Sequence, residues 1–321
     1  MKIFSVYDAT QLNAGPKAKV DVEKILVKNY NAKDKVLLQK KKTYKIKGLL
    51  YYIFYGGKDL AVFNFPYSKR EYIYDKFKNK IAFIHDIEGL RTNNEEELKH
   101  ELRILNKFNY LVVHNDTMKN FLKEHGIDEN KMFVLEIFDY LCFMEKAERN
   151  FDKNNITVVY TGNFNKSPFL NQLESNKMNF KMNLYGVGNF ENQENDKLIL
   201  CGAYKPNELP NHIKGDLGLV WDGLNDSSDE DVLFKNYTKY NNPHKFSCYL
   251  AARLPVIVWE KAAIAKTVKK YNIGYTISNI YDINNLDFSD YMEKLENVKD
   301  LQEKVRSGYF TKRVMDEILN K

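Results

Sequence analysis

The chain has 321 residues, of which 44% are hydrophobic and 29% charged, a composition typical of globular domains with sizeable cores. Its three cysteines are far apart and in no metal-binding spacing, which excludes a disulfide scaffold and a structural zinc site. The net charge of +6 favours anionic partners only mildly. Because no zinc finger, basic zipper or RNA-recognition signature is present, we expect no sequence-specific binding of nucleic acid.

Short apolar runs alternate with longer amphipathic stretches, which is the pattern of βα units around a parallel sheet and predicts the α/β class. In the first half the predicted strands are Lys2–Val6, Leu60–Phe63, Ile81–Ile84, Tyr110–Val113 and Met132–Glu136. The predicted helices are Ala18–Asn29, Ser68–Lys78, Glu95–Asn106 and Asp116–Glu124. We expect Asp116 and Thr117 to cap the last helix and Gly126 to end it.

A nearly wholly polar stretch, residues 145–155, precedes a second alternating half. The predicted strands there are Ile156–Tyr160, Phe180–Tyr185, Lys197–Cys201, Leu217–Trp221, Val256–Trp259 and Tyr275–Ile277, with helices after Lys166, Pro206, Pro243 and Lys261. We therefore expect two similar α/β domains, residues 1–150 and 151–302, that face each other across a cleft. Residues 303–321 are predicted to form a helix that packs back on the first domain.

The strongest local pattern is Tyr240–Ser247. Asn242 can cap a helix and Pro243 suits its first position, so His244 and Lys245 would lie in the first turn. There the helix dipole, backbone amides and a lysine together favour a diphosphate. A capped helix with an exposed lysine is an equally good interpretation.

Two further segments join a predicted strand to a helix. Tyr160–Ser167 contains Gly162, which permits close backbone approach at the end of a parallel strand, and Lys166, which is either a ligand or solvated. Asn13–Asp21 places Pro16 at the start of the first helix.

Ionisable residues end one strand in each half. His85, Asp86 and Glu88 follow Ile81–Ile84, where a general base could reach a substrate, although a satisfied polar strand end is the alternative. In the second half Asp222 could contact a sugar hydroxyl or merely cap a turn.

Several strings, taken together and in order, resemble those of the bacterial β-1,6-galactofuranosyltransferases of cell-surface polysaccharide assembly. They are Asn13–Lys19, Asn64–Pro66, Ile84–Ile87 with Leu90 and Arg91, Ile137–Leu141, Gly218–Gly223, Tyr240–Lys245 and Ile273–Tyr275. More distantly, the chain is similar to the glucosyltransferases that extend GlcNAc on streptococcal serine-rich adhesins. The resemblance implies a GT-B architecture with an acceptor-side domain first and a nucleotide-sugar domain second, and it implies no metal or other cofactor beside a UDP-sugar donor.

The resemblance also implies donor contacts. In the adhesin glucosyltransferases these fall in segments that match Lys166, Tyr204 and Pro243–Cys248 here, with a first-domain contact near Pro16 and Lys17. With the patterns above, the predicted nucleotide-sugar site comprises Gly15, Pro16, Lys17, Gly162, Lys166, Tyr204, Asp222, Asn242, Pro243, His244, Lys245, Phe246, Ser247 and Cys248.

We therefore expect a transferase that moves galactofuranose from its UDP donor to a glycan acceptor on a lipid or a protein. If the reaction inverts, a first-domain base must deprotonate the acceptor, and Asp86 is the first choice, followed by His85 and Asp8. The loop Asn225–Val232 lacks the glycines that these relatives carry there, which leaves the donor sugar open. A UDP-glucose-type hexosyltransferase acting on a glycoprotein and a UDP-sugar-binding homologue without activity are the alternatives.

The cellular location is predicted from two features. Met1–Asp8 has the pattern of neither a signal peptide nor an anchor, and no apolar run approaches about 20 residues, so we expect a cytoplasmic protein. Five lysines between Lys40 and Lys47 precede the apolar run Leu49–Tyr55, which suits reversible contact with an anionic inner leaflet. A core helix with a solvated lead-in is the alternative, and the oligomeric state, with a homo-oligomer as one option, stays open.

Overall fold

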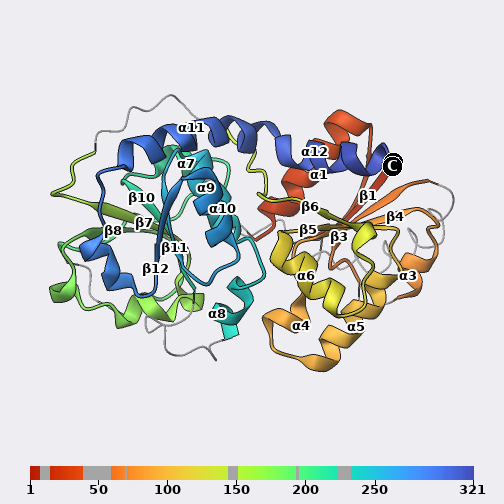
Figure 1. Cartoon of the computed structure of the whole chain (residues 1–321), viewed down its shortest axis with the longest axis horizontal. Helices are drawn as coiled ribbons and strands as arrows, with labels where there is room; N and C mark the ends of the chain where they lie inside the picture. Colours follow the sequence, from red (N-terminus) through yellow and green to blue (C-terminus); the bar gives the residue numbers. More distant parts are fainter. Residues whose placement is uncertain (8–14, 39–58, 69–70, 144–150, 193–194, 223–232) are drawn as a thin grey trace. The chain divides into compact units, whose positions relative to one another are not determined.

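The computed structural model describes residues 1–7, 15–38, 59–68, 71–143, 151–192, 195–222 and 233–321 (Figure 1). Its first half contains β1 (Lys2–Tyr7), α1 (Lys17–Tyr30), β2 (Lys33–Leu38), β3 (Ala61–Phe65), α3 (Tyr72–Asp75), β4 (Lys80–Ile84), α4 (Glu88–Arg91), α5 (Glu95–Asn106), β5 (Tyr110–Val113), α6 (Asp116–Glu124) and β6 (Met132–Val134). The strands and helices of the second half are β7 (Thr157–Asn163), β8 (Lys181–Val187), β9 (Leu198–Leu200), α7 (Leu209–His212), β10 (Leu217–Val220), α8 (Leu233–Thr238), α9 (His244–Ala251), β11 (Val256–Trp259), α10 (Ile264–Tyr271), β12 (Gly274–Ile277), α11 (Tyr291–Ser307) and α12 (Tyr309–Leu319).

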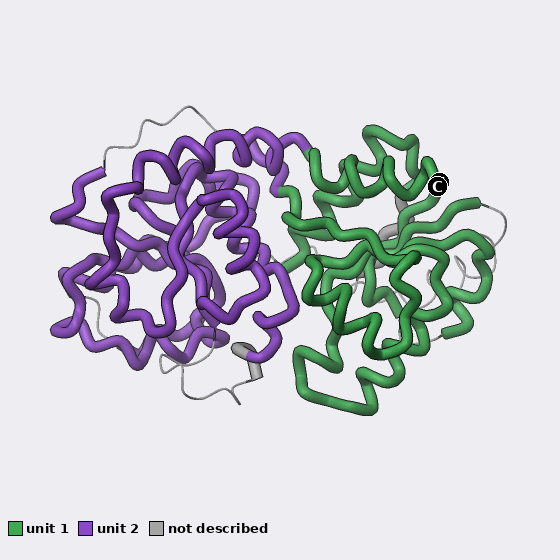
Figure 2. The backbone as a smooth tube through the Cα atoms, in the orientation of Figure 1, with its two compact units in different colours: residues 1–11, 15–139, 308–321 green, residues 12–14, 140–307 purple. Residues whose placement is uncertain are grey.

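The chain forms two compact units (Figure 2). Unit 1 joins strand β1 and Gly15–Asp139 to the carboxyl-terminal segment Gly308–Lys321, and unit 2 includes Tyr140–Ser307. Each unit holds one six-stranded sheet whose paired strands are all parallel in the part of the chain that is described. The predicted α/β class with two parallel sheets is therefore confirmed, whereas the cleft between the domains stays a prediction.

The first sheet has the strand order β2-β1-β3-β4-β5-β6. Sequence patterning misses β2, which pairs with β1 along its whole length from Lys2 opposite Lys33 to Tyr7 opposite Leu38. This strand lies at the sheet edge and begins Lys-Asp-Lys, so it lacks the apolar run that marks the inner strands. The order reverses between β1 and β3, and in Figure 1 α1 and α12 cover one face of the sheet while α5 and α6 cover the other.

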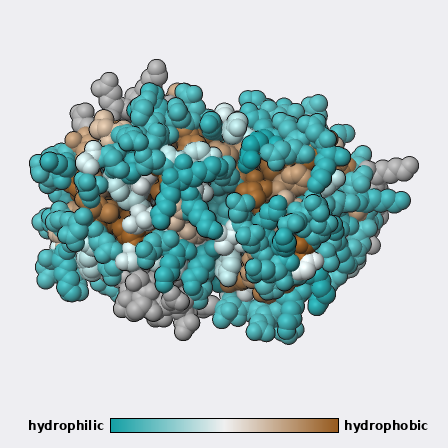
Figure 3. Space-filling model, in the orientation of Figure 1, coloured by the Kyte–Doolittle hydropathy of each residue, from teal (hydrophilic) through white to brown (hydrophobic). Residues whose placement is uncertain are grey.

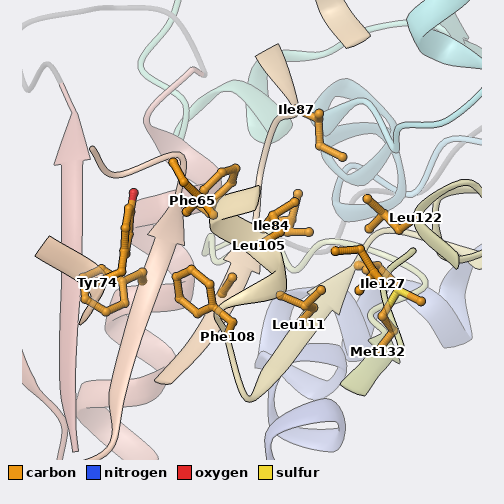
Figure 4. Close-up of a cluster of buried hydrophobic side chains, with 14 of the residues drawn as sticks. Phe65, Tyr74, Ile84, Ile87, Leu105, Phe108, Leu111, Leu122, Ile127 and Met132 are labelled. Atoms are coloured by element: carbon orange, nitrogen blue, oxygen red, sulfur yellow. The ribbon is translucent and has the colours of Figure 1, made fainter. Parts of the chain in front are cut away.

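One core cluster packs α5 and α6 against the first sheet (Figure 4). Aromatic rings pack together within it: Phe4 stacks on Phe63 with centroids 4.7 Å apart, and Tyr74 meets Phe63 edge to face with centroids 5.0 Å apart. Burying each such side chain contributes about 1.5–3 kcal/mol. The predicted strands β3, β4 and β5 are inner strands of the sheet, and their residues are almost all buried.

Local interactions override two predicted helices. The Ser68–Lys78 helix is reduced to α3, because the Tyr74 hydroxyl bonds both the N–H and the carbonyl of Ser68 at 2.7 Å and holds that residue outside a helix. The helix expected after Lys166 is a series of 3₁₀ turns, Phe164–Lys166, Pro168–Gln172 and Ser175–Lys177. Pro168 has no N–H to continue the first turn, so the segment forms separate short turns and no continuous α-helix.

Helix α6 has the predicted bounds but a different cap. The side chain of Asn115, and not that of Asp116 or Thr117, accepts from the Met118 N–H at 2.9 Å. Gly126 follows the helix with a φ of +87°, as its predicted role requires.

The carboxyl-terminal helix is two helices separated by Gly308. This glycine has a φ of +77°, and a Cβ there would lie 2.8 Å from the Ile25 side chain of α1, so a larger residue would break both the turn and the packing. At the start of α12 the buried Asp139 carboxylate accepts the N–H of Phe310 at 3.2 Å and of Thr311 at 2.7 Å. Burial raises the pKa of Asp139 to about 7, although these N–H donors act in the opposite direction.

The second sheet has the order β12-β11-β10-β7-β8-β9, in which the chain starts at the centre, runs outward to β9 and returns to β10. Helix α9 packs against β10, β11 and α11. The face in Figure 3 is largely hydrophilic, with hydrophobic residues in small separate groups. None of the helices within the described ranges is long and apolar enough to span a membrane.

Candidate functional site

The strand order of the second sheet reverses between β7 and β10. In open α/β sheets ligands bind beyond the carboxyl ends of the strands at such a reversal. Gly162 and Asn163 end β7, and Trp221 and Asp222 follow β10, so the sequence-predicted Gly162 and Asp222 lie at this edge.

Lys245 extends from the first turn of α9 to the same edge. Its Nζ lies 3.0 Å from Oδ1 of Asp222, 3.1 Å from the carbonyl oxygen of Trp221 and 3.1 Å from the hydroxyl of Tyr160. The lysine side chain is 14% exposed and that of Asp222 25%. Burial is the largest single effect and would lower the pKa of Lys245, but the Asp222 carboxylate and the neighbouring tyrosines together outweigh it, so the pKa lies above its usual value. The edge therefore holds a permanent cation that solvent hardly screens.

The start of α9 differs from the predicted cap by one residue. The helix begins at His244, and Pro243 is its N-cap in an extended conformation, with no capping side chain among the described residues. The buried Asn242 precedes it. His244 stacks on Tyr140 with ring centroids 4.9 Å apart.

Three residues of the predicted stretch face inward instead. Phe246, Ser247 and Cys248 are at most 2% exposed and belong to the packed side of α9. Of this stretch, the half-buried His244 and Lys245 are the side chains that could meet a ligand.

The turn after β7 carries Lys166. The Asn163 side chain accepts the Asn165 N–H at 3.0 Å and so orders the turn, which leaves Lys166 exposed. Tyr204 is half-buried and stacks on His212 with centroids 4.0 Å apart and planes 13° apart. Such a pair of rings offers an aromatic surface of the kind on which a base can stack.

The predicted first-domain donor contact has a different local structure. Pro16 is the N-cap of α1 beside the exposed Gly15, whereas Lys17 is buried and forms an ion pair with Asp21 one turn along the helix. These residues belong to unit 1, so the structure does not bring them together with Lys245 in one unit.

His85 is held firmly at the end of β4. The Asn64 amide nitrogen donates to Oγ of Ser5 at 2.7 Å and to the Lys19 carbonyl at 3.2 Å, so its Oδ1 is left as the acceptor for Nε2 of His85 at 2.9 Å. The ring is stacked with both Phe83 and Phe138 at 5.5 Å. A neutral His85 therefore carries its proton on Nε2.

Asp86, the next residue, is half-buried at the edge of the first sheet. Its negative charge acts on Lys19 of α1: burial lowers the pKa of Lys19, and Asp86 partly opposes this effect. Asp86 is thus more open to a ligand than His85, which is 8% exposed.

Glu101 is a residue that sequence reasoning missed. Its carboxylate accepts the N–H of Glu88 at 3.0 Å and that of Gly89 at 2.9 Å, at the start of α4 just after Asp86. Burial raises its pKa to about 6 despite these donors. The sequence signal that could have identified Glu101 is its place on the apolar face of α5, three residues after Leu98 and four before Leu105, where a charged side chain is unexpected.

Three predicted features lie outside the described residues: Asp8, the Lys40–Lys47 segment with Leu49–Tyr55, and the Asn225–Val232 loop.

The fold defines the class of protein. The structure superposes on the Anabaena protein HepE in complex with UDP and glucose with a TM-score of 0.64 at 11% identity, covering 100% of this chain and 98% of that one. The architecture is that of the GT-B glycosyltransferases, as predicted.

Residues 1–137 and 158–318 match the amino-terminal and carboxyl-terminal domain models of the glucosyltransferase 3-like proteins, and the chain belongs to this glycosyltransferase family. It is 29% identical over 281 residues to the β-1,6-galactofuranosyltransferase WbbI of Escherichia coli K12, covering 82% of this chain and 80% of the relative. It is 24% identical over 289 residues to glucosyltransferase 3 of Streptococcus gordonii, covering 84% and 81%. The family resemblance seen in the sequence is confirmed.

Proposed function

We propose that this glycosyltransferase moves galactofuranose from UDP-galactofuranose to a glycan acceptor of a cell-surface polysaccharide. The observation that carries the donor half of the proposal is the Lys245 ammonium, held with little solvent at the strand reversal of the second sheet. The leaving group of a UDP-sugar is a diphosphate, and a preorganised cation stabilises the negative charge that develops on it.

The donor site proposed in unit 2 also uses Lys166 and the first turn of α9. Lys166 is exposed and can approach a phosphate, and the amino end of α9 adds the positive end of a helix dipole. The stacked Tyr204 and His212 would receive the uracil ring. HepE, which shares this fold, has been solved in complex with UDP, and this likeness supports the choice of nucleotide.

The acceptor half is proposed for unit 1, with Asp86 as general base. An inverting transfer requires a group that takes the proton of the attacking hydroxyl, and a half-buried carboxylate at a strand end can do so. The Glu101 carboxylate would keep the Asp86 loop in place through Glu88 and Gly89.

The choice of galactofuranose rests on the E. coli relative, and glucose is the alternative that the Streptococcus relative supports. The two donor sugars can be distinguished by measuring the rate of UDP release from UDP-galactofuranose, UDP-galactose and UDP-glucose, each with and without acceptor. A ligand at 100 times its dissociation constant should stabilise the fold by about 2.7 kcal/mol, which a thermal shift detects. UDP binding without turnover of any sugar would favour an inactive binding homologue.

Metal independence is part of the proposal. Within the described residues no group of three or more His, Cys, Asp or Glu side chains could hold a metal ion. Following the family resemblance, we expect turnover to persist in excess EDTA, and a loss that Mg²⁺ or Mn²⁺ restores would contradict this point.

The place of action proposed is the cytoplasmic face of the membrane, where lipid-linked acceptors would be met. The lysines between Lys40 and Lys47 predict sedimentation with anionic but not neutral vesicles, reversed by salt. A protein that stays in the supernatant at low ionic strength would contradict peripheral binding and leave the transferase proposal untouched.

A further inference from the structure

The hydroxyl of Tyr160 contacts one candidate phosphate-binding lysine of unit 2, Lys245, and the serine that follows the other, Lys166. Tyr160 comes from the middle of β7, is 1% exposed, and has its hydroxyl 3.1 Å from Nζ of Lys245. The same hydroxyl forms a hydrogen bond with Oγ of Ser167, and this serine follows Lys166 directly. The ammonium of Lys245 also lies 4.5 Å from the centre of the Tyr160 ring.

The direction of each hydrogen bond follows from the groups involved. An ammonium only donates, so the Tyr160 oxygen accepts from Lys245. Ser167 Oγ donates to the carbonyl oxygen of Asn163 at 2.9 Å, because a carbonyl only accepts. The Tyr160 proton is therefore directed to Ser167, and the chain runs from Lys245 through Tyr160 and Ser167 to Asn163.

This chain of hydrogen bonds joins segments that are far apart in sequence. Lys245 belongs to α9, while Asn163 and Ser167 enclose the turn that carries Lys166 after β7. The ring of Tyr160 packs against Phe169 at 5.1 Å, which a phenylalanine could do equally well. Packing alone therefore does not require the buried hydroxyl. Its hydrogen bonds to Lys245 and Ser167 fix the distance between α9 and the turn, which a phenylalanine could not do.

We propose that Tyr160 and Ser167 are positioning residues that hold the Lys166 turn and the Lys245 ammonium in one arrangement before a diphosphate binds. The inference rests on the proposed donor site, and it adds that affinity depends on this ordering as well as on charge. If both segments are ordered in the free protein, binding does not have to restrict them.

The first experiment needs no ligand. Amide hydrogen exchange of residues 163–167 in the free protein should become faster in Tyr160→Phe and in Ser167→Ala. Tyr291→Phe is the matched control, because its buried hydroxyl donates to the Asp216 carbonyl at 2.9 Å, just before β10 and far from the strand ends that form the site. Unchanged exchange in Tyr160→Phe would overturn the inference.

The second experiment measures UDP affinity by calorimetry. Tyr160→Phe should weaken UDP binding about fivefold, and Tyr291→Phe should not change it even if it lowers the melting temperature. In a Lys166→Ala background the same Tyr160 substitution should weaken UDP only about twofold, because the turn no longer presents a charge.

The outcomes separate the two proposals. Equal weakening by Tyr160→Phe in both backgrounds, or no weakening at all, overturns the positioning role while leaving the donor site intact. Failure of the wild-type protein to bind UDP contradicts the proposed function, and hydrogen exchange still decides whether the hydroxyl chain orders the turn.

Discussion

The edges at which the parallel strands end differ in chemistry between the two units. In unit 2 the edge presents the Lys245 ammonium, fixed by Asp222 and Tyr160. In unit 1 it presents Asp86 beside an imidazole, with the buried Glu101 behind it. The same fold thus presents a lysine ammonium at this edge in one unit and a carboxylate in the other, and the side chains after the strands make the difference.

The two edges also keep their charges in place by different means. Unit 2 compensates a buried cation with a carboxylate and a carbonyl, so the charge persists without ligand. Unit 1 compensates the buried Glu101 with two backbone N–H groups, which lower the pKa of this carboxyl, but burial has the larger effect and raises the pKa to about 6. A fixed positive charge suits phosphate binding. In unit 1 the proposed base is Asp86, and the buried Glu101 would only hold the backbone next to it in place.

The largest effect is expected for Asp86→Asn. If Asp86 is the base of unit 1, turnover should fall about 10²- to 10⁴-fold while UDP affinity and melting temperature change little. Glu88→Gln, two residues further at the start of α4, is the matched control and should keep turnover within a few-fold. Near-normal turnover in Asp86→Asn would move the base elsewhere or indicate a retaining reaction.

A pH-dependent effect is expected for Asp139→Asn in unit 1. The pKa of Asp139 rises from 3.8 to about 7 on folding, so stability from its neutral form is complete below about pH 4 and lost as pH rises through 7. In denaturant unfolding, the free energy of unfolding of the variant should rise relative to that of the wild type by up to about 1.4 kcal/mol per pH unit between pH 4 and 7. Glu96→Gln, an exposed control, should show a constant difference, and the same constant difference for Asp139→Asn would contradict the shifted pKa.

Lys245→Ala tests the charge of unit 2. A charge-assisted contact of about 1.5–3 kcal/mol corresponds to a rise in the UDP dissociation constant of about 10- to 150-fold, with the fold kept. Adding Asp222→Asn should recover part of the loss, since the single variant leaves a carboxylate near the phosphates. Lys177→Ala removes a lysine from an exposed ion pair of the same unit and should leave UDP affinity unchanged. Unchanged affinity in Lys245→Ala would refute the site.

The smallest effect is expected for Lys166→Ala, about two- to fivefold in UDP affinity. This lysine is exposed, so solvent screens its interaction with a phosphate more than that of Lys245. A loss as large as that of Lys245→Ala would show that the turn, and not α9, dominates diphosphate binding.

The spacing of apolar residues along the sequence correctly predicted helices and strands that depend only on residues close together in the chain. Helices α5 and α6 have the predicted bounds because their apolar residues recur at helical spacing, and β5 has them because its run is short and apolar. Strand β2 was missed because an edge strand needs no apolar run. The prediction of a Ser68–Lys78 helix was wrong because the side-chain hydroxyl of Tyr74, six residues along the chain, bonds the backbone of Ser68 and holds it outside a helix.

The sequence by itself determined the α/β class, the family and the strand ends that carry Asp86, Asp222 and Gly162, because each depends on local periodicity or on ordered motifs. Only the tertiary structure decided which residues meet there. Lys245 reaches Tyr160 and Asp222 across 85 and 23 positions of the chain, and Glu101 closes on Gly89 from the next helix. Such contacts depend on strand order and helix packing, and these follow from the burial of the whole core rather than from any one segment.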